Sequence, residues 1–211
     1  MNRHTSIQGY KGDDFLQNQP QPTMAMHPKK FALWLIIVTI IMIFAAFTSA
    51  YLVRKGEGNW AEFELPQIFW LNTAVLFASS LTMQWAYYSA KRNNINWLKT
   101  AMVLTVLLGI GFLIGQWESW VYLTERNIFF GGNDPSNPYP ANPSGSFLYV
   151  LTGVHAFHLI TGLIFLAVVT IAAFQYKVHS KSMVRIDMCA TYWHFLDVLW
   201  IYLFVFLLLN H

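Results

Sequence analysis

The stretch FALWLIIVTIIMIFAAFTSAYLV, residues 31–53, contains 23 residues and no Asp, Glu, Lys or Arg. About 20 mostly apolar residues, each rising 1.5 Å, allow an α-helix to cross the hydrocarbon core of a bilayer. Helices and closed barrels are the only structures that satisfy their backbone hydrogen bonds in lipid. This stretch therefore predicts a transmembrane helix.

Four further stretches of low charge follow it along the chain. They cover residues 65–90, 100–117, 135–176 and 188–211, and Asp197 is the only charged residue within them. The start of the third of these is rich in Pro, Asn and Gly and is typical of a loop. We therefore predict an all-α polytopic membrane protein, a bundle of five transmembrane helices. The predicted spans lie near residues 30–54, 66–90, 98–124, 146–175 and 188–210.

The composition of the chain supports one membrane domain. Hydrophobic residues make up 55% and charged residues 11% of 211 residues, whereas soluble domains contain about 25% charged residues. We assign residues 29–211 to the five-helix domain. Residues 1–28 form a polar tail that we expect to be disordered or bound to a partner, and it lacks the pattern of a signal peptide. Because the net charge is only +3 and the basic residues flank the helices, no nucleic-acid partner is expected.

The Lys and Arg residues are distributed unequally between the two sides of the predicted bundle. Ten lie on the side of the N-terminus and three, Arg54, Lys55 and Arg126, on the other side. Cytoplasmic loops are enriched in Lys and Arg. The sequence therefore predicts a cytoplasmic N-terminus and a C-terminus outside, with the long loop 126–146 on the outer face.

Polar residues within the predicted spans are the candidates for function, because they are costly in lipid. His155 and His158 are three residues apart on one helical face, and Gly162 follows four residues later. With His194 they can form a metal site, or they can hydrogen-bond to neighbouring helices. Asp197, three residues after His194, can act in a proton relay or in a structural polar contact inside the bundle.

Other polar and small residues can likewise have a structural or a functional role. Asn72 begins a series of amide and hydroxyl groups suited to hydrogen bonds between helices. Glu118 lies between Trp117 and Trp120 near the outer interface and is either an interfacial or a functional carboxylate. Gly111 and Gly115 form a small-xxx-small face that permits close helix contact. The sequence contains no nucleophile–base pair, phosphate-binding loop or Cys cluster, so we predict no catalytic residue in this chain.

Three motifs in this order carry a resemblance to a known family. They are WLNTAVLFASS (residues 70–80), GVHAFHLITGL (residues 153–163) and YWHFLDVLWIYLF (residues 192–204). Together they resemble cytochrome c oxidase subunit III, the subunit III family of the haem–copper respiratory oxidases, in its short bacterial form with five helices. The motifs contain Trp193 as well as Asn72, His155, His158, Gly162, His194 and Asp197.

The resemblance implies an accessory subunit without a redox centre. Haem and copper would lie in partner subunits I and II, and this chain would bind neither. It would pack against subunit I in the bacterial inner membrane, hold structural phospholipids and support proton uptake. Arg92 and Arg185 are the predicted partners of lipid phosphates. Family carboxylates have their nearest counterparts in Glu64 and Glu118, although this chain has Gln-Trp-Glu at 116–118 where the family often has Gln-x-x-Glu.

The sequence is compatible with two classes of function. The first is the accessory subunit of a proton-pumping oxidase that reduces oxygen to water, with cytochrome c as electron donor or, alternatively, a quinol. The second is a standalone proton-coupled transporter in which His194 and Asp197 form the site. The absence of an internal repeat in the sequence and of helices broken by Pro or Gly argues against the transporter.

Overall fold

The structure, a computed structural model, describes residues 28–58, 60, 65–131, 143–175 and 183–210. Five long helices account for nearly all of this part of the chain, which confirms the predicted all-α class and the number of helices. Each lies within a few residues of a predicted span. They are α2 (Pro28–Gly56), α3 (Ile68–Lys91), α4 (Ile95–Glu125), α5 (Pro143–Phe174) and α6 (Met183–Asn210). The predicted tail falls almost entirely outside the described residues.

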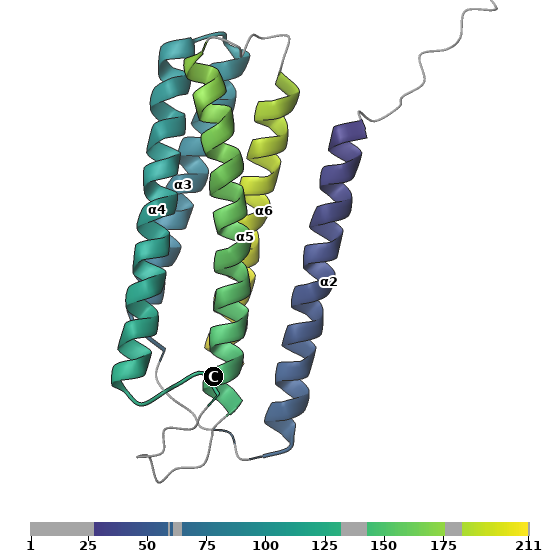
Figure 1. The fold of residues 1–211 in the computed structure, drawn as a ribbon, viewed down its shortest axis with the longest axis vertical. Coiled ribbons are helices and arrows are strands. Elements are labelled where there is room, and N and C mark those ends of the chain that lie inside the picture. Colours follow the sequence, from purple (N-terminus) through teal and green to yellow (C-terminus); the bar gives the residue numbers. More distant parts are fainter. Residues whose placement is uncertain (1–27, 59, 61–64, 132–142, 176–182, 211) are drawn as a thin grey trace, which may run out of the picture.

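The helices lie side by side along the long axis and alternate in direction (Figure 1). The chain starts α2, α4 and α6 at one end of the bundle and starts α3 and α5 at the other. The last described residue therefore lies at the end opposite to the start of α2. This up-and-down arrangement agrees with an odd number of membrane crossings.

Four of the five helices, α2, α4, α5 and α6, are long and apolar enough by themselves to cross a membrane. Helix α3 is less apolar because it carries Asn72, Gln84 and several hydroxyl residues. However, α2 and α4 run in the same direction, so α3 has to return the chain across the bundle between them (Figure 1). Its polar side chains face its neighbours, as shown below, while Trp70, Leu71, Phe77 and Leu81 are exposed on its outer face.

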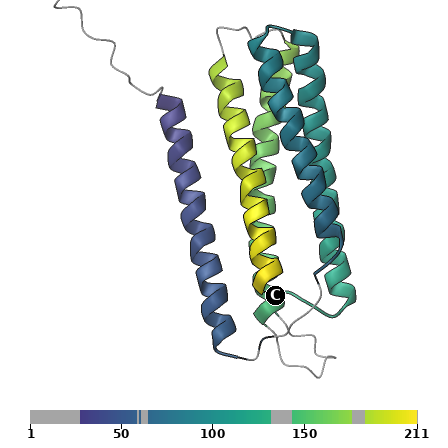
Figure 2. The ribbon, with the colours of Figure 1, turned by 180° about the vertical axis from the view of Figure 1, so that it is seen from behind.

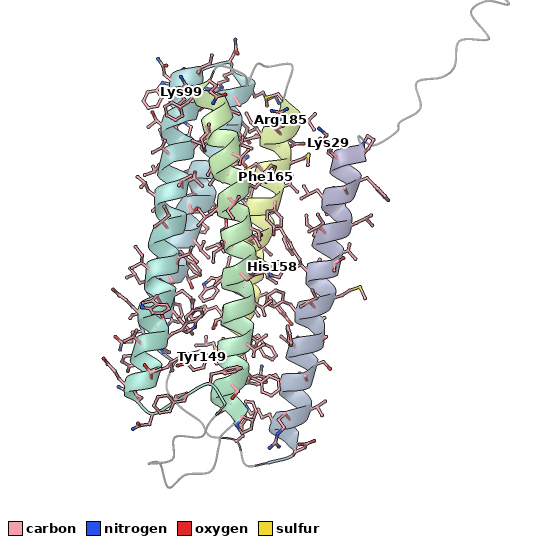
Figure 3. The ribbon with its side chains drawn as sticks, viewed as in Figure 1. Lys29, Lys99, Tyr149, His158, Phe165 and Arg185 are labelled. Atoms are coloured by element: carbon pink, nitrogen blue, oxygen red, sulfur yellow. The ribbon has the colours of Figure 1, made fainter. Side chains whose placement is uncertain are left out.

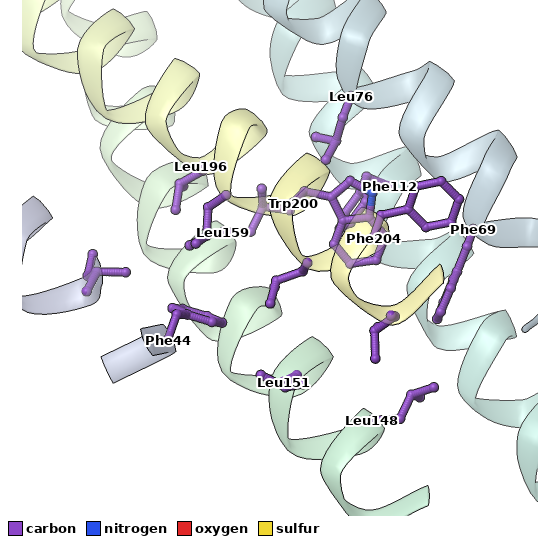
Figure 4. Close-up of a cluster of buried hydrophobic side chains, with 14 of the residues drawn as sticks. Phe44, Phe69, Leu76, Phe112, Leu148, Leu151, Leu159, Leu196, Trp200 and Phe204 are labelled. Atoms are coloured by element: carbon purple, nitrogen blue, oxygen red, sulfur yellow. The ribbon is translucent and has the colours of Figure 1, made fainter. Parts of the chain in front are cut away.

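The core between α3, α4, α5 and α6 contains a cluster of aromatic rings. Trp200 contacts Phe112 edge to face at a centroid distance of 4.8 Å and Phe69 at 5.6 Å. All three side chains are at most 1% exposed. Figure 4 shows these rings packed together among the helices, with Leu76 and Phe204 beside them. Edge-to-face contacts of this kind stabilise a core beyond the area that they bury.

Helix α2 stands apart from the other four (Figure 1; Figure 2, from behind) and contacts α5 and α6. Its C-terminal part is joined to the end of α6, where Tyr51 Oη and Lys55 Nζ donate hydrogen bonds of 2.8 and 2.7 Å to the carbonyl oxygen of Asn210. At the other end of α2, Lys30 Nζ lies 2.5 Å from the carboxylate of Asp187 on α6. Helix α2 is thus attached to α6 near both of its ends.

Candidate functional site

The two His residues of α5 lie in different environments although they are three residues apart. His155 is fully buried in the core, with its ring 5.9 Å from Phe112 and 5.2 Å from Trp200. His158 lies on the side of α5 that faces α2, where its ring is 5.9 Å from Phe44 and its Nδ1 is 2.8 Å from the carbonyl oxygen of Val154. The two imidazoles therefore do not converge on one point.

The third intramembrane His is held between α6 and α3. His194 Nδ1 is 2.8 Å from Ser80 Oγ, and His194 Nε2 is 3.1 Å from Gln84 Oε1. A neutral imidazole with its proton on Nε2 satisfies both contacts, donating to Gln84 and accepting from Ser80. In the structure His194 therefore contacts two polar side chains of a neighbouring helix.

Asp197 lies beneath this contact, close to the middle of α6. It is 4% exposed, and its Oδ2 is 4.0 Å from His194 Nδ1, which is too long for a hydrogen bond. Neither carboxyl oxygen makes a hydrogen bond of ordinary geometry within the described chain, although the Ser80 side chain is close enough to act on the carboxyl. A buried carboxyl group with so few donors is costly, so Asp197 would gain from a further donor on a partner subunit.

Three glycines lie at close contacts between helices. Only one of them, Gly115, belongs to the predicted pair Gly111 and Gly115. A Cβ atom on Gly109 would lie 2.8 Å from both Leu163 and Trp193, and one on Gly162 would lie 2.8 Å from Leu196. A Cβ atom on Gly115 would collide with the side chain of Asn72. Gly111 has no neighbouring atom within 4 Å. The small-residue contact of α4 therefore uses Gly109 and Gly115, which lie on the faces that meet other helices.

Trp193 fills the space that Gly109 leaves open. It is 1% exposed, and its indole Nε1 donates a 2.8 Å hydrogen bond to Ser79 Oγ on α3. About two turns further along α6, Trp200 Nε1 donates to Thr73 Oγ1 at 3.1 Å. The hydroxyl residues of α3 that the sequence singled out thus accept hydrogen bonds from the two tryptophans of α6.

The predicted carboxylate and arginine sites lie at the ends of helices. Glu118 is exposed near the end of α4, between the exposed Trp117 and the half-buried Trp120. Arg92 is exposed at the end of α3, and Arg185 is exposed in the first turn of α6 (Figure 3). Glu64 lies outside the described residues. No ion pair that involves Glu118 occurs among the described residues.

A groove of about 710 Å³ lies between α2, α5 and α6. His158 and Phe165 of α5 line it together with Met188 and Tyr192 of α6, and apolar side chains of α2 line the opposite wall. Figure 3 shows Lys29 at the start of α2 and His158 and Phe165 along α5. Tyr192 Oη is 3.1 Å from Thr161 Oγ1, so the polar atoms on this wall are few and partly bonded to each other.

Sequence reasoning predicted a groove with phospholipids but did not locate it, and it did not find the Lys30–Asp187 ion pair at the end of this groove. Both depend on how α2 is placed against α5 and α6, which no local pattern encodes. It also passed over the burial of Gln116, which is 1% exposed and makes no side-chain hydrogen bond within the described chain. An amide inside the charge-free stretch 100–117 is a signal that could have identified this position.

Comparison with known proteins gives one consistent result. The model of the family described as cytochrome c oxidase subunit III matches residues 21–210. Cytochrome c oxidase subunit 3 of Homo sapiens is 29% identical over 189 residues, which cover 83% of this chain and 67% of the human protein. The same-named protein of Corynebacterium diphtheriae is 30% identical over 173 residues, 78% of this chain and 80% of that protein.

A relative from another type of oxidase matches at nearly its full length. Cytochrome bo(3) ubiquinol oxidase subunit 3 of Buchnera aphidicola is 29% identical over 187 residues, which cover 86% of this chain and 94% of that protein. The family match spans every described helix, including the three motifs on α3, α5 and α6. The chain therefore belongs to the cytochrome c oxidase subunit III family, the third subunits of haem–copper terminal oxidases.

Proposed function

We propose that this chain is an accessory subunit that carries no redox centre of its own, and that haem and copper are bound by partner subunits I and II. The observation that carries the proposal is the separation of the three intramembrane His residues. His155 packs against aromatic rings, His158 against α2, and His194 against Ser80 and Gln84. In the part of the chain that the structure describes, no three His, Cys, Asp or Glu side chains gather as metal ligands would.

The proposed role of the chain is to stabilise catalytic subunit I and to support proton uptake in a proton-pumping oxidase of the bacterial inner membrane. Many large apolar side chains on α2, α3 and α4 are exposed in the isolated chain, for example Met42, Leu71 and Ile114. They suit contact with lipid and with helices of other subunits. The energetic contribution of such contacts comes from packing and from hydrogen bonds, because lipid is as apolar as the side chains.

Phospholipid is the proposed occupant of the groove between α2, α5 and α6. Its walls are almost entirely apolar, and Lys29 lies at the end where the basic side of the bundle is predicted. An acyl chain between the helices with its phosphate near Lys29 matches this distribution. Arg185, in the first turn of α6, is at the same end of the bundle (Figure 3).

Cytochrome c is the proposed electron donor of the complex, and a quinol is the second candidate. The relative from Corynebacterium diphtheriae, a cytochrome c oxidase subunit, matches over 80% of its length. The ubiquinol oxidase subunit matches over 94% of its length, which is the observation in favour of a quinol. The choice is made by the partner subunits that bind the donor.

Purification through a tag on this chain in a mild detergent tests the proposal. We expect a reduced-minus-oxidised haem spectrum in the eluate, together with two polypeptides identified as oxidase subunits I and II. Oxygen consumption with reduced cytochrome c or with a quinol then identifies the donor. A chain that elutes alone and without haem would favour the transporter. Stoichiometric copper or iron on the chain after its separation from the partners, lost on His155→Ala, would contradict the non-redox role.

A further inference from the structure

Besides Asp197, three buried polar side chains in the core have hydrogen-bonding atoms without a partner among the described residues. They are Asn72 on α3, Gln116 on α4 and His155 on α5, and each is at most 1% exposed. Five of their atoms make no hydrogen bond: Asn72 Nδ2, Gln116 Nε2 and Oε1, and both ring nitrogens of His155. We call these residues the polar triad. Buried polar groups in native proteins are almost always paired, so the triad requires an explanation.

The contacts between the helices place the polar triad at one depth. Trp120 Nε1 donates a 3.1 Å hydrogen bond to Thr152 Oγ1 and thereby aligns α4 with α5. Because the two helices are antiparallel, one turn back from Trp120 and one turn on from Thr152 lead to Gln116 and His155. Close contact between Gly115 and the Asn72 side chain aligns α3 with the same level of α4.

The polar triad lies near the buried aromatic pair Phe112 and Trp200. His155 contacts both rings, Phe112 precedes Gln116 by one helical turn, and Trp200 bonds to Thr73, the neighbour of Asn72. Two amides and one imidazole from three helices are therefore buried at about the same depth of the core. Their unpaired atoms do not form hydrogen bonds with one another.

We propose that the polar triad binds internal water. The unsatisfied atoms include donors, the amide N–H groups and one imidazole N–H, and acceptors, the Gln116 carbonyl and the second imidazole nitrogen. Water both donates and accepts, and a buried water commonly makes about three such bonds. A cation or an anion fits less well, because the triad contains uncharged amides and offers donors and acceptors together. Water bridges polar groups that are too far apart to bond directly.

This inference does not depend on the proposed function, because it concerns the interior of this chain in whatever assembly the chain is purified. A density map of the intact assembly at a resolution that reveals ordered water tests it. We expect peaks about 2.7–3.2 Å from polar atoms of the triad. A map in which these amides and the imidazole bond directly to each other, with no water between them, would overturn the proposal.

A matched pair of variants adds a second readout. Gln116→Met keeps the length of the side chain but removes its donor and acceptor, and we expect the water peaks to be weakened or lost. Gln84→Met makes the same change on α3, where Gln84 is partly exposed and bonded to His194. We expect the peaks to persist there. If Gln116→Met prevents assembly, the map of the unaltered protein still decides the question.

Hydroxyl-radical footprinting by X-ray radiolysis gives an independent measurement, because radicals formed from bound water modify adjacent side chains. Trp200 and Trp193 are both 1% exposed on α6, but only Trp200 contacts His155. We expect modification of Trp200 to exceed that of Trp193 and the excess to disappear in Gln116→Met. Equal modification of the two tryptophans in the unaltered protein would count against bound water at the triad.

Discussion

At the scale of single residues, Asp197 combines burial with a lack of hydrogen bonds. We expect its main role to be contact between helices or with a partner subunit. Hydrogen bonds between membrane helices contribute on average about 0.6 kcal/mol, so Asp197→Leu should weaken retention of this chain in the complex without abolishing it. Asp197→Asn, which keeps the shape and removes the ionisable group, should leave assembly and turnover close to normal. Subunit stoichiometry after purification and oxygen consumption measure these effects.

The relay interpretation makes the opposite prediction for the same variants. If Asp197 moved a proton, Asp197→Asn would assemble normally while proton pumping or turnover collapsed. Ser79→Ala provides a control, because it removes a hydroxyl of α3 that accepts a hydrogen bond from Trp193 of α6 but leaves the carboxyl in place. Loss of pumping in Asp197→Asn with normal assembly would therefore contradict the packing role.

Gly109 and Gly111 offer a test of close packing within one helix. Gly109→Val would place methyl groups against Trp193 and Leu163, whereas Gly111→Val would meet no atom within 4 Å. Overpacking a core costs about 1–3 kcal/mol, so we expect the first variant to be less stable than the second by about this amount. Thermal unfolding of the purified assembly measures the difference. Equal stability would show that α4 can shift to accept the larger side chain.

At the scale of the elements, α2 differs from the other helices because it is attached to α6 near both ends and leaves a groove between them. The Lys30–Asp187 pair is partly exposed, and such pairs contribute at most about 1 kcal/mol. An occupant of the groove would add contacts between α2 and the helices α5 and α6. We infer that bound lipid acts as part of this interface.

Ala32→Trp tests the role of the groove. Ala32 lines the groove, so the larger side chain should displace lipid from it. Ala74→Trp is the matched control, because Ala74 is also exposed but lies on α3 and does not line the groove. Native mass spectrometry of the complex should show fewer bound phospholipids in Ala32→Trp than in Ala74→Trp. A map of the unaltered complex with a groove packed by protein alone would contradict the lipid assignment.

At the scale of the whole molecule, the alternating helices place the start of α2 and the end of α6 at opposite ends of the bundle (Figure 1). The excess of Lys and Arg predicts that the first of these ends faces the cytoplasm. We predict that Asn94→Cys, in the exposed turn between α3 and α4, is labelled from the cytoplasmic side. Phe130→Cys, exposed after α4, should be labelled from outside.

The labelling is measured with an impermeant thiol reagent on intact spheroplasts and on inverted vesicles. Cys189, the single native cysteine, is buried, and Cys189→Ser removes its background signal. Labelling of Phe130→Cys from the inside would reverse the predicted orientation and place the C-terminus in the cytoplasm.

The sequence by itself determined the helices, because apolar runs in lipid leave the backbone no alternative to internal hydrogen bonding. It also identified His155, His194 and Asp197 as unusual, because polar groups are costly at membrane depth. Its motifs were sufficient to indicate the family, which the family match over residues 21–210 confirmed.

Only the tertiary structure decided how these residues are used. The sequence placed His155 and His158 on one helical face. However, side chains three residues apart still point in different directions, so the two rings contact different neighbours. One enters the aromatic core and the other faces α2. In the same way, Gly109 rather than Gly111 lies against Trp193. The rotation and the register of whole helices decide which side chains face each other. They also decide where the groove beside α2 lies and which atoms of the polar triad stay unpaired. Packing between segments far apart in the sequence sets both.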